Sequence, residues 1–188
     1  MEERSLLQKL DGILRLEQVH TQIHLTVERV RTELSRKRGA LMAWEPISLN
    51  LFGYALPAVI RSSWIFILRA GANTGAERHP NSHQRMMSFD GTGDMQIEAE
   101  PASTSAHVSS DIVWQSHILV SDPEASLERR WISIPQNVWH RPVIPKGADW
   151  VVVSFHTVPA EELIEERPPD GAAGMMKRMR YMASDRKG

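Results

Sequence analysis

Apolar side chains recur every three or four residues through residues 5–38, the spacing that places them on one face of an α-helix. Gly39 follows a Ser-Arg-Lys-Arg run, which is typical of a helix end. A helix of this length cannot bury an apolar stripe against itself. We therefore expect it to lie on the rest of the domain or on a second chain. The stripe has heptad spacing and consists of Ile13, Leu16, Ile23, Val27, Val30 and Leu34, with His20 in the remaining position.

From about residue 44 the pattern changes to short runs rich in β-branched and aromatic residues, separated by Gly, Pro, Asn and Asp. No helical spacing lies between the runs, which is typical of an all-β sandwich or barrel. The polar segment 98–111 contains four serines and is expected to be an exposed loop. Strands are expected at Ser48–Phe52, Trp64–Arg69, Met86–Phe89, Ile112–Val120, Trp131–Ile134 and Trp150–Val158.

The pattern divides the chain into an N-terminal helical segment (1–40), a β-barrel domain (44–168) and a basic, Met-rich tail (169–188). The tail permits two interpretations. It is either a flexible solvated end or a short amphipathic helix that docks on a membrane surface or a partner. In the second case one side would carry Met175, Met176, Met179 and Met182, and the charges would come from Lys177, Arg178, Arg180, Arg186 and Lys187 against Asp185.

Composition excludes several classes of function. Lys plus Arg number 22 and Asp plus Glu 23, and this balance argues against nucleic-acid binding by the whole surface. The absence of cysteine excludes disulfides, thiolate zinc sites, iron–sulfur clusters and a cysteine nucleophile. No apolar run approaches the roughly 20 residues of a membrane span. The first residues, Met-Glu-Glu-Arg, do not resemble a secretory leader, so we expect a cytoplasmic protein.

Two stretches carry candidate chemistry. The first, residues 71–91, places Glu77, His79 and His83 close together, and the second, residues 134–140, ends on His140. Carboxylates and neutral imidazoles are ligands that borderline divalent metals prefer. Glu77 and His79 would share one face of an extended chain, because side chains alternate along a strand. On spacing alone, these histidines are equally compatible with hydrogen-bonding residues on surface loops.

The spacing in both stretches resembles the motifs of the cupin superfamily over residues 45–160. In its first motif, Gly-x5-His-x-His-x3–4-Glu-x6-Gly, Glu77 replaces the first His and Gln84 replaces the Glu, between Gly71 and Gly91. In its second motif, Pro135-x-Asn137-x2-His140 matches Pro-x-Gly-x2-His. Asn at the Gly position makes physical sense, because Asn tolerates a left-handed turn. Arg129 and Ile144 depart from the outer Gly and Asn of this motif.

The resemblance implies a mainly β fold, a cupin-type double-stranded β-helix (jelly-roll) barrel preceded by a long N-terminal α-helix. It also implies one divalent transition metal ion, Fe, Mn, Zn or Ni, at the barrel mouth. Carried over by position, the ligands are Glu77, His79, Gln84 and His140. If the inter-ligand loop has three residues, His83 takes the place of Gln84, which as a neutral amide is a poor ligand. The set that we favour is therefore Glu77, His79, His83 and His140.

Other polar residues are expected to line a ligand pocket. Gln84 would line it if His83 is the ligand, and Arg85 and Gln115 would suit an anionic or sugar ligand. His117 and His156 lie in apolar runs, where a structural histidine is the first expectation and a pocket residue the second. The resemblance thus implies a protein that binds a divalent metal and a small polar molecule, carboxylate or sugar-like.

The resemblance leaves the class of activity open. Isomerase, lyase and dioxygenase chemistry all occur among cupins with this motif. The alternative is a non-catalytic cupin that binds or senses a small molecule and has lost its metal. A third interpretation, a purely structural or interaction protein, would have no open cavity. We further expect a homodimer, because cupins often pair through their sheets and the helix stripe needs cover.

Overall fold

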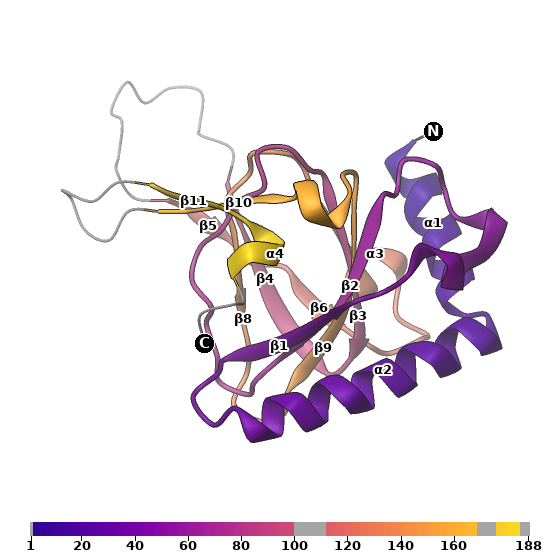
Figure 1. Ribbon diagram of the computed structural model, residues 1–188, viewed down its shortest axis with the longest axis horizontal. Helices are drawn as coiled ribbons and strands as arrows, with labels where there is room; N and C mark the ends of the chain where they lie inside the picture. Colours follow the sequence, from indigo (N-terminus) through magenta and orange to yellow (C-terminus); the bar gives the residue numbers. More distant parts are fainter. Residues whose placement is uncertain (1, 100–111, 169–175, 185–188) are drawn as a thin grey trace.

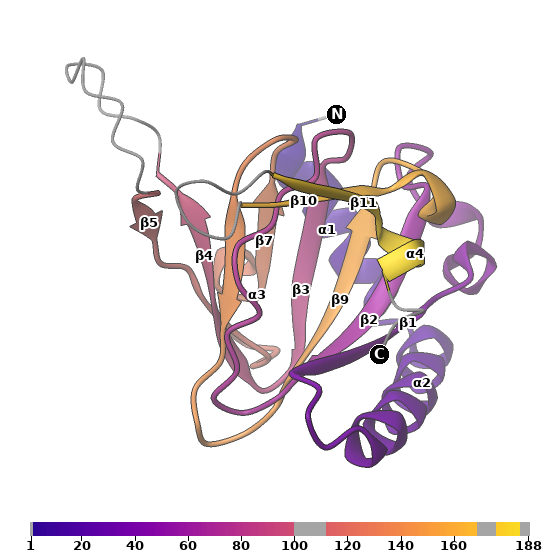
Figure 2. The same cartoon turned by 60° about the vertical axis from the view of Figure 1, so that its left-hand side comes forward.

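The computed structural model describes residues 2–99, 112–168 and 176–184. The main feature of the fold is a pair of antiparallel sheets that face each other (Figures 1 and 2). The first sheet has the order β1 (Met42–Pro46), β2 (Ser62–Leu68), β9 (Trp150–His156), β3 (Gln84–Asp90) and β7 (Trp131–Ile134). The second consists of β5 (Trp114–Gln115), β4 (Thr92–Glu98) and β6 (Ile118–Val120), with β8 (His140–Val143) also paired to β4.

The first sheet is buried on both faces because it lies between two apolar cores. Alternate side chains of a strand point to opposite faces. Trp64, Phe66 and Val152 belong to the core inside the barrel, whereas Ile65 and Val153 belong to the core outside it. The central strands β2 and β9 are therefore buried along their whole length. This explains their continuous apolar sequence.

Two N-terminal helices cover the outer face of this sheet (Figure 1). The single helix predicted over residues 5–38 is divided into α1 (Glu3–Leu14) and α2 (Glu17–Arg36), because Leu16 has an extended backbone (φ −62°, ψ 127°). An unbroken helix of that length would span about 50 Å. The break lets both apolar stripes, including Leu10 and Ile23, reach the same outer core. The helices therefore lie on their own barrel, the first of the two arrangements expected.

The strand predictions have mixed outcomes. The one at 131–134 is confirmed with its predicted bounds, those at 64–69, 86–89 and 150–158 are confirmed with shifted ends, and the one at 112–120 is divided into β5 and β6. The strand at 48–52 was wrong. That segment is part of the 3₁₀ helix η1 (Leu49–Ala55), whose turn depends on Gly53 at φ +67°. Strands β1, β4 and β8 were missed because their apolar runs are short or interrupted by polar residues.

A separate two-stranded hairpin lies across one end of the barrel (Figure 2). The chain passes from the short 3₁₀ helix η2 (Ala160–Glu162) into β10 (Ile164–Arg167), which pairs with β11 (Lys177–Arg180) before α4 (Tyr181–Ser184). The described part of the tail is thus neither a flexible end nor one amphipathic helix, because residues 177–180 form a strand and 181–184 a short helix. Residues 169–175 and 185–188, and 100–111 of the expected loop, lie outside the described residues.

The architecture confirms the predicted fold class, a mainly β barrel with a long N-terminal helix. The short helix α3 (Leu127–Arg130) completes the described elements. Within the described ranges, no helix is long and apolar enough to cross a membrane.

Candidate metal centre inside the barrel

The structure brings the two motif stretches together through their backbones. The amide of Glu77 donates to the carbonyl of His140, and the amide of His140 donates to the carbonyl of Glu77, both over 2.9 Å. A third bond, of 3.0 Å, runs from the amide of Asn137 to the carbonyl of His79. Residues about sixty positions apart are thus held side by side at one end of the barrel. His140 begins β8, and Glu77 and His79 lie in the segment before β3.

Glu77, His79 and His140 form a compact triad. One potential ligand atom from each of these residues lies within 4.8 Å of the others. The two imidazole centroids are 5.4 Å apart, and Nε2 of His140 is 3.6 Å from Oε1 of Glu77. His79 is 3% exposed and His140 is 1% exposed. The triad therefore lies in a region of low dielectric constant, where an uncompensated charge or lone pair is costly.

The hydrogen bonds of both imidazoles determine which nitrogen carries the proton. Nδ1 of His79 lies 3.0 Å from the carbonyl oxygen of Ile164, and Nδ1 of His140 lies 3.1 Å from that of Val138. A carbonyl oxygen only accepts, so each Nδ1 donates, and in the neutral form of the ring Nε2 carries the lone pair. Nε2 of His140 is buried and has no hydrogen-bond partner. This is the arrangement in which imidazoles bind metal ions.

Burial and neighbouring charges keep the triad ready to bind a cation. Burial alone would raise the pKa of Glu77, but His140, His79 and Arg167 lower it to about 2. Burial, together with the neighbouring His140, lowers the pKa of His79 to about 4. Around neutral pH, Glu77 is therefore ionised and His79 is neutral, which are the forms that bind metals.

Two charged residues of β10 support this site and were missed by the sequence reasoning. Nη2 of Arg167 donates to Oε2 of Glu77 over 3.0 Å, and the same guanidinium forms an ion pair with Glu165. Burial and the nearby Glu77 raise the pKa of Glu165 to about 7. Glu165 and Arg167 are two positions apart in a strand and so share one face. The spacing of Glu165 and Arg167 is visible in the sequence, but it does not show that their shared face points into the barrel.

Gln84, not His83, faces the barrel interior. Gln84 lines a small interior cavity together with Glu77, and its Oε1 is buried without a hydrogen-bond partner. Its Nε2 donates to Ser154 Oγ over 3.3 Å. Adjacent residues at the start of β3 point to opposite faces of the sheet, so only one of the two can reach the interior. The motif position of the cupin carboxylate is therefore occupied by a neutral amide.

His83 and Arg85 belong to a separate polar cluster under α1. Nε2 of His83 lies 2.7 Å from Ser133 Oγ. Arg85 makes two hydrogen bonds of 2.8 Å to the carboxylate of Glu3, which also accepts one from Ser133. The structure does not bring His83 to the triad, nor Arg85 into the interior cavity. The function of this cluster is to fasten the first turn of α1 to the barrel.

The remaining predicted residues lie elsewhere. Gln115 is exposed on β5, and His117 is partly buried beside a hollow outside the barrel. His156 is a satisfied structural histidine. Its Nε2 lies 2.9 Å from Ser154 Oγ and its Nδ1 lies 3.2 Å from Ser82 Oγ. Because both nitrogens are in use, His156 packs against His79 without a free ligand atom.

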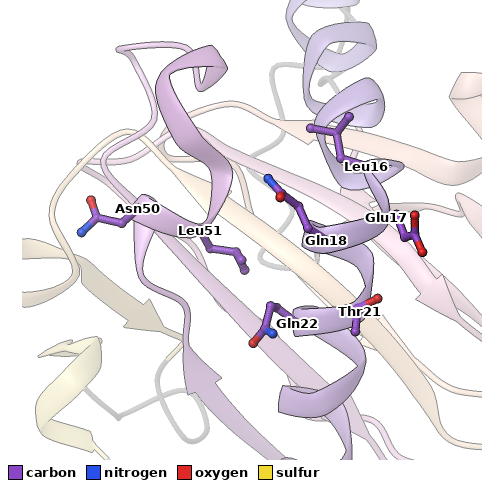
Figure 3. A pocket seen from close by; sticks show the side chains of 7 residues that line it. All are labelled: Leu16, Glu17, Gln18, Thr21, Gln22, Asn50 and Leu51. Carbon is purple, nitrogen blue, oxygen red and sulfur yellow. The ribbon is translucent and has the colours of Figure 1, made fainter.

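One hollow of the surface is much larger than the interior cavity but offers no metal site. A broad, open hollow of about 810 Å³ lies between α2 and η1 (Figure 3). Glu17 is its only titratable residue, which is too little to hold a cation. Its lining consists of Leu16, Glu17, Gln18, Thr21, Gln22, Asn50 and Leu51. The interior cavity beside Glu77 measures about 30 Å³, the space of about one water molecule.

Comparisons with known proteins give structural similarities only. No family model and no curated protein matches the chain. Oxalate oxidase in complex with the substrate analogue glycolate is similar over 63% of this chain and 52% of its own, at 15% identity and a TM-score of 0.43. The capsular polysaccharide assembling protein CapF from Staphylococcus aureus, with the inhibitor 3-isopropenyl-tropolone, is similar over 64% of this chain and 29% of its own (13% identity, TM-score 0.45).

Oxalate decarboxylase from Lactobacillus farciminis, as a formate complex, is similar over 63% of this chain and 29% of its own, at 13% identity and a TM-score of 0.44. The chain spans about half or less of the length of these three proteins.

The class of protein follows from the molecule itself. Two facing antiparallel sheets, a chain that passes from one sheet to the other between β3 and β4, and two motif stretches hydrogen-bonded at one end define a cupin-type double-stranded β-helix. Its interior carries a two-histidine, one-carboxylate cluster that can hold a metal ion.

Proposed function

We propose that this chain is a cupin-type protein that binds one divalent transition metal ion through Glu77, His79 and His140, with a small polar molecule beside it. The observation that carries the proposal is the buried Nε2 of His140, which has no hydrogen-bond partner and lies 3.6 Å from Oε1 of Glu77. A buried polar atom without a partner is costly unless a ligand satisfies it. Two imidazoles and one carboxylate suit Fe(II), Mn(II), Zn(II) or Ni(II) and leave coordination positions open.

When bound, such an ion would supply Lewis-acid chemistry toward an oxygen atom of a small molecule. The protein's own residues have separate tasks. The carbonyls of Ile164 and Val138 hold the two imidazoles in the ligating tautomer. Arg167 holds the second oxygen of Glu77 and thereby orients the carboxylate. Isomerase, lyase and dioxygenase reactions are all compatible with this set.

Metal analysis of chain purified without chelator or a nickel column tests the proposal. We expect about one equivalent of a divalent transition metal after reconstitution with Mn(II), Fe(II), Ni(II) or Zn(II). His140→Gln should weaken binding at least about 100-fold, because it removes a ligand. His83→Gln is the matched control and should bind as the wild type does, since His83 lies in the cluster under α1. Fewer than about 0.2 equivalents in every case would overturn the metal site.

A second candidate function is a metal-free cupin that binds or senses a small molecule. Gln84 favours it, because a neutral amide stands where metal-binding cupins have a carboxylate ligand. Arg167 favours it as well, since this cation already neutralises Glu77. The same metal analysis separates the two functions.

The oligomeric state and cellular location remain predictions. The stripe that motivated a helix-mediated homodimer is buried on the chain's own barrel, so a dimer would have to form through another surface. Light scattering of the full chain tests this, and a mass twice that of one chain is the expected result. A cytoplasmic location likewise stays a proposal.

A further inference from the structure

The barrel interior beside the triad is filled by a tyrosine from the far end of the chain. Tyr181 begins α4, and its amide donates to the carbonyl of Leu163 over 2.9 Å. Its ring is only 4% exposed. The centroid of the ring lies 5.5 Å from Trp44, 6.0 Å from Trp64 and from Phe66, and 6.2 Å from His79. We call these four surrounding residues the aromatic cage.

The interior also contains polar atoms that the chain does not satisfy. Nε1 of Trp64, in the wall of the cage, is a fully buried donor without a partner. Oε1 of Gln84 is a buried acceptor without a partner, and Gln84 shares the small interior cavity with Tyr181 and Glu77. Buried donors and acceptors are rarely left unpaired without a functional reason. Here an acceptor and a candidate metal ligand line a space that admits about one water molecule, and the unpaired donor lies on Trp64, which packs against Tyr181.

Tyr181 has an aromatic ring and a polar hydroxyl end, and its surroundings suit both. Its ring meets aromatic walls at distances typical of favourable ring–ring packing. The charge of Arg167 lies near enough to interact with Tyr181. An apolar ring with one polar end is the chemistry of a phenol.

Two short elements carry Tyr181 into the cage. Helix α4 has four residues, and β11, which precedes it, pairs within the described residues only with β10. Lys177, Arg178 and Arg180 of β11 are exposed. Segments with few buried side chains and exposed backbone pairing open at low free-energy cost.

We propose that the aromatic cage is a binding site for the phenolic ring of a small external ligand, and that Tyr181 occupies this site when the ligand is absent. Ligand and Tyr181 then compete for one space. This inference deepens the proposed function, because it places the ring beside the triad, and it names phenols as the ligand class. Ring binding itself needs no metal ion, so the two proposals fail separately.

Fluorine NMR of the wild-type chain tests the competition directly. The chain has two tyrosines, so 3-fluorotyrosine labels only the caged Tyr181 and the fully exposed Tyr54. Titration of chelator-treated protein with p-cresol should move the Tyr181 signal to the position of a solvent-exposed tyrosine. The Tyr54 signal should stay in place. 4-Methylcyclohexanol has the same substituents without the aromatic ring and should leave both signals unchanged.

Calorimetry on two matched variants measures how much Tyr181 weakens the binding of p-cresol in the cage. Tyr181→Ala should bind p-cresol at least about tenfold more tightly than the wild type, because the competing side chain is gone. Tyr54→Ala should bind as the wild type does. If Tyr181→Ala does not fold, Tyr181→Leu keeps an apolar filler without the phenol, and the labelled wild type gives a result by itself.

Three results would overturn the inference. The first is a Tyr181 signal that does not move up to the solubility limit of p-cresol. The second is equal binding of 4-methylcyclohexanol, which would make the cage a non-specific apolar space. The third is binding by Tyr181→Ala alone with no displacement in the wild type, which would make Tyr181 a permanent part of the core. A chain that binds p-cresol but no metal would support this inference and overturn the metal site.

Discussion

Single residues with unusual backbone or packing determine how the two sheets close on each other. Asn137 has φ +66°, the left-handed conformation that the resemblance to cupins predicted at a motif glycine. Asn137 lies in the turn that leads to His140 and brings His140 next to Glu77. Gly93 on β4 is required for a different reason. A Cβ atom there would lie 2.1 Å from the ring of the fully buried Trp150. The motif signal revealed the first requirement, but no local pattern reveals the second, because it depends on a residue 57 positions away.

Gly93→Ala should destabilise the fold by about 2–3 kcal/mol, because the methyl group and the Trp150 ring cannot both fit. Chemical denaturation monitored by tryptophan fluorescence and circular dichroism measures the change. Gly12→Ala is the matched control. Gly12 lies in α1 with nothing within 4 Å of its would-be Cβ, so the variant should gain about 0.5–1 kcal/mol. A Gly93→Ala chain as stable as the wild type would refute the packing argument.

At the scale of elements, α1 is anchored to the barrel through a buried carboxylate. Asp11 forms an ion pair with Arg130 of α3, and one of its oxygens accepts from Trp131 Nε1 over 2.9 Å. Arg15 donates a further bond of 2.9 Å to the same carboxylate. The heptad stripe correctly predicted which face of the helices is apolar. It did not predict the break before α2, because the spacing continues across Leu16 and only the size of the barrel requires a bend.

Asp11→Asn should cost about 3 kcal/mol, because it leaves the buried guanidinium of Arg130 without its counter-ion. Equilibrium unfolding in urea measures this cost, and hydrogen exchange should show α1 losing protection before the barrel strands do. Glu28→Gln breaks an exposed ion pair with Arg31 and should change stability by less than about 0.5 kcal/mol. Equal effects of the two substitutions would mean that Asp11 is not an anchor.

At the scale of the whole molecule, the parts predicted from the sequence lie in the buried sheet and the motif stretches. The parts that were not predicted lie in the hairpin across the end of the barrel. The central strands and the triad members Glu77, His79 and His140 were predictable, because local composition and motif spacing carry them. The contributions of Glu165, Arg167 and Tyr181 were not predictable. They come from a segment beyond the motifs, which reaches the interior only because β10 crosses the barrel end.

Because β10 crosses the barrel end, it buries Glu165, and this makes the free energy of unfolding depend on pH. The pKa of Glu165 is about 7 in the folded chain, raised by burial and by Glu77, against a reference value of 4.5. Between these values the folded state binds the extra proton, so the contribution of Glu165 to stability falls as pH rises from about 4.5 to 7. The lowered pKa values of His79 and His156 act in the opposite direction. The difference in the free energy of unfolding between Glu165→Gln and the wild type therefore measures the contribution of the Glu165 carboxyl group alone.

Glu165→Gln should match the wild type near pH 4, where the buried carboxyl group is neutral, and should become the more stable chain as pH rises. The gain at pH 8 should be of the order of 2–3 kcal/mol. Urea unfolding of the chelator-treated chain at several pH values measures it. Glu161→Gln, at an exposed glutamate of η2, should show no such trend. A gain independent of pH, or one that grows toward acid, would mean that Glu165 is ionised together with Glu77 throughout and that Arg167 compensates both charges.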